Sequence, residues 1–363
     1  MKNFRIFNNS RVIVTGHTGF KGSWLTAWLK RLGANVMGIS LNIPTKPSNF
    51  YVSKINQGIK DVRLDIRNKK KLQKKILEFK PHFIFHLAAQ SLVGESYKSP
   101  QITWQTNVFG TLNLLETLRK LKHSCTVVII TSDKCYFNKE IHYGYKETDI
   151  LGGKDPYSGS KASAELLIKS YIESFFSHKK NNIFITSARA GNVIGGGDWA
   201  TDRIVPDCVR SWSKNNIAMI RNPKATRPWQ HVLEVIGGYL RLAAELNKKK
   251  NLHSESFNFG PSLSKEFSVK QLVTKIGYYW KKVSWKIYPK IRKKKFAEST
   301  LLRLNCNKSK RILKWKNILK FDETSKFVAD WYRNYYGNNS NMKKFTEFQI
   351  KEYEKLLKQR QIK

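Results

Sequence analysis

The chain has 363 residues, enough for one large domain or two closely joined ones, and 40% of them are hydrophobic. This composition is typical of a packed globular protein and excludes a disordered one. The formal net charge of +41 would suit a nucleic-acid binder, but lysines are spread along nearly the whole sequence and no nucleic-acid motif accompanies them. The densest basic runs are short and separated: Lys69–Lys75, Lys248–Lys250 and Lys290–Lys295. We therefore expect no nucleic acid as a partner, but a surface that attracts anionic ligands.

The cysteines and the apolar stretches indicate the compartment. The four cysteines are widely spaced and form no CxxC pair, which argues against a zinc site and favours a reducing cytoplasm. The N-terminus has no apolar stretch of signal-peptide length, and no window approaches about 20 uninterrupted apolar residues. We expect a cytoplasmic protein with neither a membrane span nor a metal.

The first predicted strand, Val12–Thr15, runs into a glycine-rich turn that a helix follows. The turn has the spacing GxxGxxG, and its positions without a Cβ would let a pyrophosphate approach the backbone at the helix N-terminus. The cofactor-binding residues that we expect in this turn are Gly16, His17, Thr18, Gly19, Phe20, Lys21 and Gly22.

The second predicted strand, Asn35–Leu41, ends without the acidic residue that usually binds the adenosine ribose of NAD. Ser40 or Asn42 would have to hydrogen-bond the ribose instead. Lys46 could accommodate a 2′-phosphate, so these residues alone do not decide between NAD and NADP.

Strands and helices then alternate. Strands at 59–67, 82–89 and 126–131 are separated by helices at 69–79 and 107–121. The second of these strands is nearly all apolar, as in a parallel sheet covered on both faces. The alternation predicts a doubly wound parallel-sheet α/β fold, a Rossmann domain.

Further cofactor contacts are expected near the ends of these strands. Asp65 is placed to accept from the adenine amino group, and the small side chains of Ala88 and Ala89 would let the cofactor lie against the backbone. The other expected members of this group are Ile66, Leu87, Asn107 and Thr131, together with Tyr157 and Lys161.

The strand at 126–131 leads into Ser132, Asp133 and Lys134, at the sheet edge where ligands bind in open α/β folds. A hydroxyl, a carboxylate and an amine side by side can hydrogen-bond a ligand and transfer protons. A polar exit from a strand into a loop is the simpler interpretation, which the following helix weakens.

That helix begins near Asp155 and Pro156 and places Tyr157 and Lys161 one turn apart on one face. A phenol titrates near about pH 10, and a neighbouring ammonium lowers its pKa. Tyr157 is therefore a candidate proton acceptor at neutral pH. A surface helix with an exposed Tyr and Lys is the alternative interpretation of this pair alone.

The second half of the chain carries most of the candidate substrate residues. A strand at 183–189 leads into a loop with four glycines in seven residues, which must fit closely around something. Arginines follow it, and a planar guanidinium binds two diphosphate oxygens at once. The expected substrate-binding residues are Gln90, Ser132, Asn192, Arg203, Arg227 and His231.

These elements suggest two domains and a tail. We expect residues 1–190 to form the dinucleotide-binding domain, with 228–260 returning to it. Residues 191–227 and 261–337 would form a smaller substrate-binding domain. The polar tail at 338–363 contains a charged amphipathic helix suited to packing or assembly rather than to chemistry.

Together these motifs resemble those of the extended short-chain dehydrogenase/reductases and, within them, of the CDP-glucose 4,6-dehydratases. The segments that carry the resemblance are Gly16–Gly22, Ala88–Gln90, Thr131–Tyr136, Gly191–Trp199 and Arg227–Val232. The likeness covers residues from about 10 to 336. It implies NAD rather than NADP as cofactor, CDP-glucose as substrate, and a homodimer or homotetramer.

The resemblance also implies a reaction: CDP-D-glucose becomes CDP-4-dehydro-6-deoxy-D-glucose, for deoxysugar and surface polysaccharide biosynthesis. Tyr157, helped by Lys161, takes the proton of the 4-hydroxyl while a hydride passes from C4 to NAD, and Ser132 hydrogen-bonds the C4 oxygen. Loss of the C5 proton then expels the 6-hydroxyl, which Asp133 protonates, and the hydride returns to C6.

Lys134 departs from the similar dTDP-glucose dehydratases, which carry Glu as the C5 base at this position. A lysine can act as that base only when neutral, and the charges of Lys161 and NAD⁺ would lower its pKa. Its role as C5 base is therefore a hypothesis.

Two other activities remain open within this class: an NDP-sugar 4-epimerase, and a 4,6-dehydratase of another nucleotide sugar. An epimerase would share Tyr157 and Lys161, but it expels no 6-hydroxyl, so Asp133 and Lys134 would have no catalytic role. A non-catalytic dinucleotide sensor would tolerate loss of Tyr157 and Lys161, yet both are present.

Overall fold

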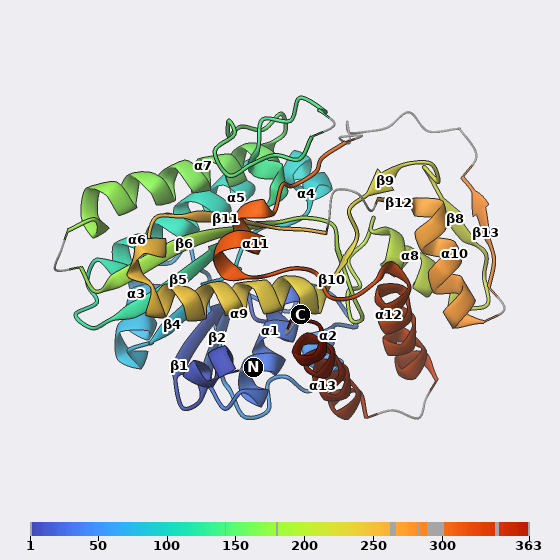
Figure 1. Ribbon diagram of the computed structural model, residues 1–363, viewed down its shortest axis with the longest axis horizontal. Helices are drawn as coiled ribbons and strands as arrows, with labels where there is room; N and C mark the ends of the chain where they lie inside the picture. Colours follow the sequence, from blue (N-terminus) through green and yellow to red (C-terminus); the bar gives the residue numbers. More distant parts are fainter. Residues whose placement is uncertain are drawn as a thin grey trace.

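The central sheet has seven parallel strands in the part of the chain that the structure describes, in the order β11-β6-β5-β4-β1-β2-β3 (Figure 1). The strands are β1 (Arg11–Thr15), β2 (Asn35–Ser40), β3 (Lys60–Arg63), β4 (Phe83–His86), β5 (Cys125–Ile130), β6 (Ile183–Ala190) and β11 (Ser256–Phe259). Because the strand order reverses between β1 and β4, this is the doubly wound Rossmann fold expected from the sequence, which is confirmed.

The structure is a computed structural model that describes residues 2–141, 143–178, 181–261, 266–281, 283–288, 301–337 and 341–361. The basic run at 290–295 and the start of the expected hinge, at 338–340, lie outside these residues. Within the described ranges, no helix is long and apolar enough to cross a membrane. No group of three or more His, Cys, Asp and Glu side chains able to hold a metal ion occurs there either.

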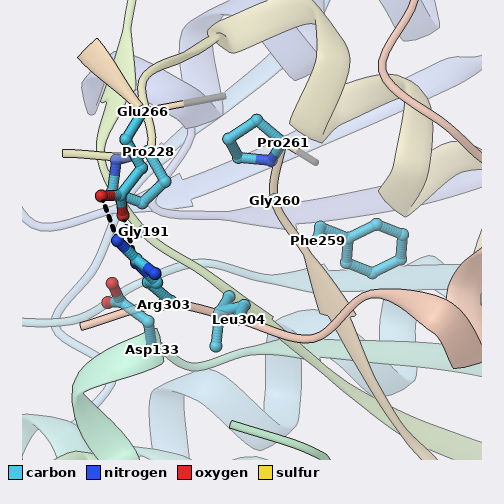
Figure 2. Close-up of a pocket in the computed structure, with 9 residues that line it drawn as sticks. All are labelled: Asp133, Gly191, Pro228, Phe259, Gly260, Pro261, Glu266, Arg303 and Leu304. Carbon is cyan, nitrogen blue, oxygen red and sulfur yellow. Dashed lines mark hydrogen bonds and ion pairs between the residues drawn. The ribbon is translucent and has the colours of Figure 1, made fainter. Parts of the chain in front are cut away.

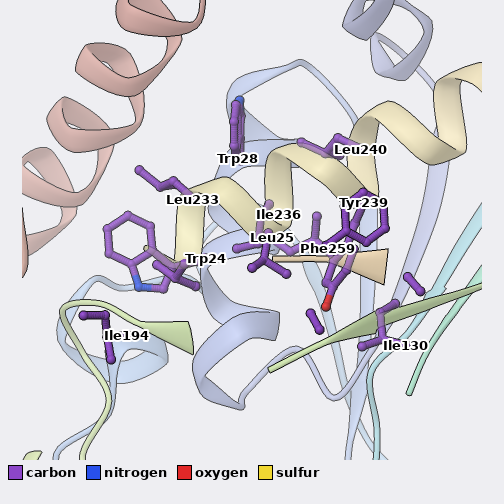
Figure 3. Packing of buried hydrophobic residues seen from close by; sticks show 14 of the residues in the cluster. Trp24, Leu25, Trp28, Ile130, Ile194, Leu233, Ile236, Tyr239, Leu240 and Phe259 are labelled. Atoms are coloured by element: carbon purple, nitrogen blue, oxygen red, sulfur yellow. The ribbon is translucent and has the colours of Figure 1, made fainter. Parts of the chain in front are cut away.

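Helices cover both faces of the sheet. α1 (Phe20–Arg31) and α9 (Val232–Lys248) pack on one face, and α3 (Lys69–Phe79), α6 (Gly110–Leu118) and α7 (Pro156–Tyr171) lie on the other (Figure 1). Figure 3 shows the first layer, where Trp24 and Leu25 of α1 lie beside α9. In β1, Val12 and Val14 belong to this layer while Ile13 belongs to the opposite one. The apolar strands thus reflect burial on both faces.

A second region adjoins the sheet, at the right of Figure 1. It contains three two-stranded sheets, which pair β7 (Val193–Ile194) with β10 (Gln230–His231), β8 (Ala218–Ile220) with β13 (Trp285–Ile287), and β9 (Thr226–Arg227) with β12 (Phe267–Ser268). Its helices are α8 (Ile204–Trp212), α10 (Val269–Trp280) and α12 (Phe321–Tyr336). The domain boundaries themselves stay a prediction.

Shorter helices connect these parts. They are α2 (Asn49–Val52), α4 (Val93–Lys98), α5 (Pro100–Trp104), α11 (Asn307–Leu313), the π-helices Gln105–Phe109 and Ile172–Phe176, and the 3₁₀ helices Lys2–Phe7, Asp133–Cys135 and Lys250–Leu252.

The last helix, α13 (Met342–Gln361), packs against α1 and α12. Tyr353 is fully buried and its Oη donates to Glu234 Oε2 of α9 at 2.8 Å. Trp28 Nε1 of α1 donates to Glu354 Oε1 at 2.9 Å. This helix is therefore part of the hydrophobic core.

Candidate active site

Helix α7 carries Tyr157 and Lys161 toward the sheet edge. Asp155 caps the helix, since its Oδ1 accepts from Ser158 N at 3.0 Å, and Pro156 occupies the first turn. Tyr157 and Lys161 are only 7% and 6% exposed. The alternative of an exposed surface pair is therefore wrong.

The segment after β5 brings Ser132 and Asp133 to Tyr157. Ser132 Oγ accepts from Lys134 N at 3.2 Å and donates to Asp133 Oδ1 at 3.0 Å. Ser132 also forms a side-chain hydrogen bond with Tyr157. Lys134 is half-buried in the 3₁₀ turn that Ser132 caps. A hydroxyl, a carboxylate and a phenol thus meet at the carboxyl end of β5, and Lys134 lies in the same turn.

The electrostatics of this cluster differ from the expectation. Burial raises the pKa of Tyr157 to about 12, against the lowering effect of the Ser132 hydrogen bond. Burial, followed by the charge of Lys21, lowers the pKa of Lys161 to about 8. The prediction that the neighbouring ammonium lowers the Tyr157 pKa is therefore wrong for this structure, because desolvation outweighs the nearby charges.

Lys21 reaches the same cluster from the glycine-rich turn. Burial and the positive charge of Arg203 lower its pKa to about 8, against the opposing effect of Asp133. Lys21 is one of the residues expected to bind the cofactor in this turn. The structure gives it Asp133 and Arg203 as electrostatic partners as well.

The glycine-rich turn fits a dinucleotide. Gly16 has a φ of +74°, and a Cβ added there would lie 2.7 Å from the backbone N of Ala88. A Cβ at Gly22 would lie 2.0 Å from Gly16 O. Gly19, the N-cap of α1, has no side chain that could accept from the first-turn amides, so the cap position leaves them to a phosphate.

The residues expected to bind the adenosine ribose, Ser40 and Asn42, form hydrogen bonds with the glycine-rich turn instead. Ser40 Oγ lies 2.9 Å from His17 Nδ1, and His17 Nε2 lies 2.9 Å from Asp61 Oδ1. Thr18 Oγ1 donates to the carbonyl O of Asn42 at 2.6 Å. Burial lowers the pKa of His17 despite the carboxylate beside it. The hydroxyl of Ser40 is thus already engaged by His17.

Other expected cofactor residues have protein partners too. Arg67 Nη2 donates to Asp65 Oδ2 at 2.6 Å, which lowers the pKa of this carboxyl. Ile66 is buried against Gly110 of α6. Leu87, Ala88 and Ala89 are half-buried just beyond the end of β4.

Asn107 connects α7 to the loop that contains Gln90. Its Oδ1 accepts from Gln90 N at 2.8 Å, and its Nδ2 donates to Ser160 Oγ at 2.9 Å. The side-chain amide of Gln90 donates to Leu92 O and to Thr103 Oγ1, both at 3.0 Å. Both side chains therefore order the loop, and their expected ligand contacts stay predictions.

The expected substrate residues occupy different environments. Arg203 Nη1 donates to Asp198 Oδ2 at 2.6 Å, and its charge acts on Tyr157. Asn192 is half-buried with a φ of +50°. Arg227 is half-buried in β9, and its Nη1 donates to Thr226 O at 2.8 Å.

His231 lies in the hydrophobic core at the start of α9. It is fully buried between the rings of Trp24 and Phe327. Its Nδ1 accepts from Leu233 N at 3.3 Å, so it caps α9. This packing gives His231 a structural role, and its expected contact with substrate stays a prediction.

A small pocket lies beside Asp133 (Figure 2). Gly191, Pro228 and Leu304 line it together with Arg303 and Glu266, and the last two form an ion pair at 2.5 Å. Sequence reasoning missed this pair, because its members are far from the recognised motifs and the chain is rich in basic residues throughout.

Residues 13–328 match the family model described as GDP-mannose 4,6 dehydratase. The chain belongs to this family. A CDP-glucose 4,6-dehydratase of Salmonella typhimurium is 44% identical over 336 residues, which are 92% of each chain. A UDP-glucose 4-epimerase of Mycoplasma genitalium is 23% identical over 91% of this chain and 98% of that protein.

Solved structures agree on the fold of this dehydratase family member. The epimerase Mth375 of Methanothermobacter thermautotrophicus superimposes with a TM-score of 0.77 at 22% identity, over 93% of this chain and 96% of that one. A dTDP-glucose 4,6-dehydratase of Bacillus anthracis in complex with NAD gives a TM-score of 0.72 at 20% identity, over 93% and 99%.

Proposed function

We propose that this member of the dehydratase family converts CDP-D-glucose to CDP-4-dehydro-6-deoxy-D-glucose and water. The observation that carries the proposal is the meeting of Tyr157, Ser132 and Asp133 in one buried cluster, with Lys134 in the same turn. The 44% identity to a CDP-glucose 4,6-dehydratase over 92% of the chain supports the choice of substrate.

The side chains divide the work as follows. Tyr157 accepts the proton of the sugar 4-hydroxyl, and Ser132 holds the C4 oxygen by a hydrogen bond. The C4 ketone acidifies the C5 proton, which Lys134 removes. Asp133 protonates the departing 6-hydroxyl, so that one water leaves. Lys161 lies one turn after Tyr157 on α7, where its positive charge would offset part of the desolvation that opposes the phenolate.

NAD, when bound, would accept the hydride from C4 and return it to C6. The glycine-rich turn from Gly16 to Gly22 and the N-terminus of α1 would hold its pyrophosphate. Leu87 and Ala88, just beyond the end of β4, would lie along the cofactor. Tyr157 and Lys161 would lie next to it.

A substrate panel tests the proposal. The protein is incubated with CDP-, dTDP-, UDP- and GDP-glucose, and the products are analysed by mass. A product lighter by one water from CDP-glucose is expected, and it should be absent with Tyr157→Phe. Products of unchanged mass would identify an epimerase. A water-loss product from another nucleotide alone would refute the substrate assignment.

We also propose that the protein acts as a homodimer or homotetramer in the cytoplasm, supplying a deoxysugar precursor for surface polysaccharide. The apolar side chains of Ile102, Trp104, Phe109 and Leu166 are 48%, 38%, 55% and 57% exposed, and a second copy would cover them. Sedimentation of the purified protein tests this, and a monomer at micromolar concentration would refute it.

A further inference from the structure

A buried ion pair with no role in the proposed reaction lies beside the catalytic helix. Glu165 follows Lys161 by one turn of α7, and Glu165 and Arg189 of β6 are only 4% and 3% exposed. Arg189 Nε donates to Glu165 Oε1 at 2.9 Å, and Arg189 Nη2 donates to Oε2 at 2.8 Å. A bidentate contact of this kind fixes α7 and β6 relative to each other.

The two partners of the pair hold opposite ends of the segment 131–136, which carries the proposed acid and base. At one end, Thr131 Oγ1 donates to Glu165 Oε1. At the other end, Arg189 Nη1 donates to Tyr136 Oη at 2.8 Å, and the guanidinium lies 5.0 Å from the centre of the Tyr136 ring. Both ends of the segment are thus tied to one ion pair.

The hydrogen bonds of the pair are saturated. Arg189 also donates to Glu147 O at 3.1 Å and to Ser256 Oγ at 3.2 Å, which occupies all its N–H groups. Glu165 Oε2 accepts from Ser187 Oγ at 2.8 Å. A shift of the segment would leave buried polar groups without partners, so the network holds it in one position.

We propose that Glu165 and Arg189 are positioning residues for the proposed reaction. By clamping both ends of the segment 131–136, they keep Asp133 and Lys134 aimed at the sugar whose 4-hydroxyl Tyr157 deprotonates. The inference rests on the proposed function for its kinetic consequence, whereas the clamp itself is a property of the described contacts.

Single hydrogen bonds to the pair provide the test, because replacing either charge would leave its partner buried and unpaired and could unfold the chain. Tyr136→Phe removes the hydrogen bond between Arg189 and the segment, together with the one that Tyr136 Oη donates to Asn258 Oδ1 at 2.8 Å, and keeps the ring contact. Ser256→Ala is the matched control, since it removes a hydrogen bond from the same guanidinium at a position outside the segment. We expect Tyr136→Phe to lower kcat for water loss roughly 10- to 100-fold with little change in KM. Ser256→Ala should keep kcat within about twofold.

Amide hydrogen exchange gives a readout that needs no turnover. Exchange at residues 132–135 should be faster in Tyr136→Phe than in Ser256→Ala at similar Tm. The same comparison can be made at the other end of the segment 131–136. Thr131→Val and its control Ser187→Ala each remove one hydrogen-bond donor to Glu165. Equal exchange, or equal kcat, in a variant and its control overturns the clamp. A wild-type protein that dehydrates no nucleotide sugar refutes the proposed function instead, and the exchange comparison still decides on the clamp.

Discussion

The carboxylate of Asp133 lies directly against Gly191. A Cβ added at residue 191 would lie 1.8 Å from Asp133 Oδ2. The two residues follow the neighbouring strands β5 and β6, and Gly191 is not among the residues with positive φ. The glycine is therefore required for space beside the carboxylate rather than for its backbone conformation.

Gly191→Ala should consequently displace Asp133 and slow the expulsion of the 6-hydroxyl by about tenfold or more, while oxidation at C4 continues. Single-turnover mixing can follow both, by the absorbance of the reduced cofactor and by the mass of the quenched sugar. Gly94→Ala in α4 is the control, because an added Cβ there meets nothing within 4 Å. Wild-type water loss in Gly191→Ala would show that Asp133 is not the acid.

Lys134→Met removes the proposed C5 base. Oxidation at C4 should proceed and water loss should stop, because Tyr157 and Ser132 remain in place while no group takes the C5 proton. Solvent deuterium at C5 and the product mass measure this. Lys139→Met changes an exposed lysine five residues on and should behave as wild type. Full turnover by Lys134→Met would exclude this lysine as the base.

Much of the fold and of the chemical cluster could be predicted from local patterns. The spacing of Tyr157 and Lys161 is a property of one helix, and the position of Ser132 follows from the rule that ligands bind at the carboxyl ends of parallel strands. The apolar strands likewise required a sheet covered on both faces, as Ile13 between Val12 and Val14 illustrates.

The parts that depend on packing between distant segments could not be predicted. Burial of Tyr157 reverses the direction expected for its pKa, and burial is a product of the whole fold. The charge of Asp133 acts on Lys21 only because the fold brings the start of α1 near the end of β5. The Glu165–Arg189 pair had one local signal, a carboxylate one turn after Lys161, but nothing in the sequence indicated its partner.

His231→Ala separates a structural role from contact with substrate. Loss of the cap and of the buried ring should lower the free energy of unfolding by about 2 kcal/mol or more, with KM for CDP-glucose unchanged. His231→Asn keeps an acceptor for Leu233 N and should recover part of the loss. Thermal unfolding and initial rates measure the two effects. An increase in KM at unchanged Tm would show instead that His231 contacts the substrate.

The burial of Lys161 predicts how stability depends on pH. Its pKa is lowered from 10.5 to about 8, so between these values the unfolded chain binds more protons than the folded one. The free energy of unfolding should therefore rise with pH in this window, by up to about 1.4 kcal/mol per pH unit from this residue. Above about pH 10 the raised pKa of Tyr157 acts in the opposite direction.

Denaturant unfolding at about pH 8 and about pH 9.5 measures this contribution. Lys161→Met should show a smaller increase in stability across this window than the wild type, because it lacks the buried ammonium. Lys70→Met, on the exposed side of α3, removes the same charge from the surface and should retain the wild-type increase. Since the background from net charge is common to both variants, equal pH dependence in all three proteins would mean that Lys161 is not desolvated in the fold.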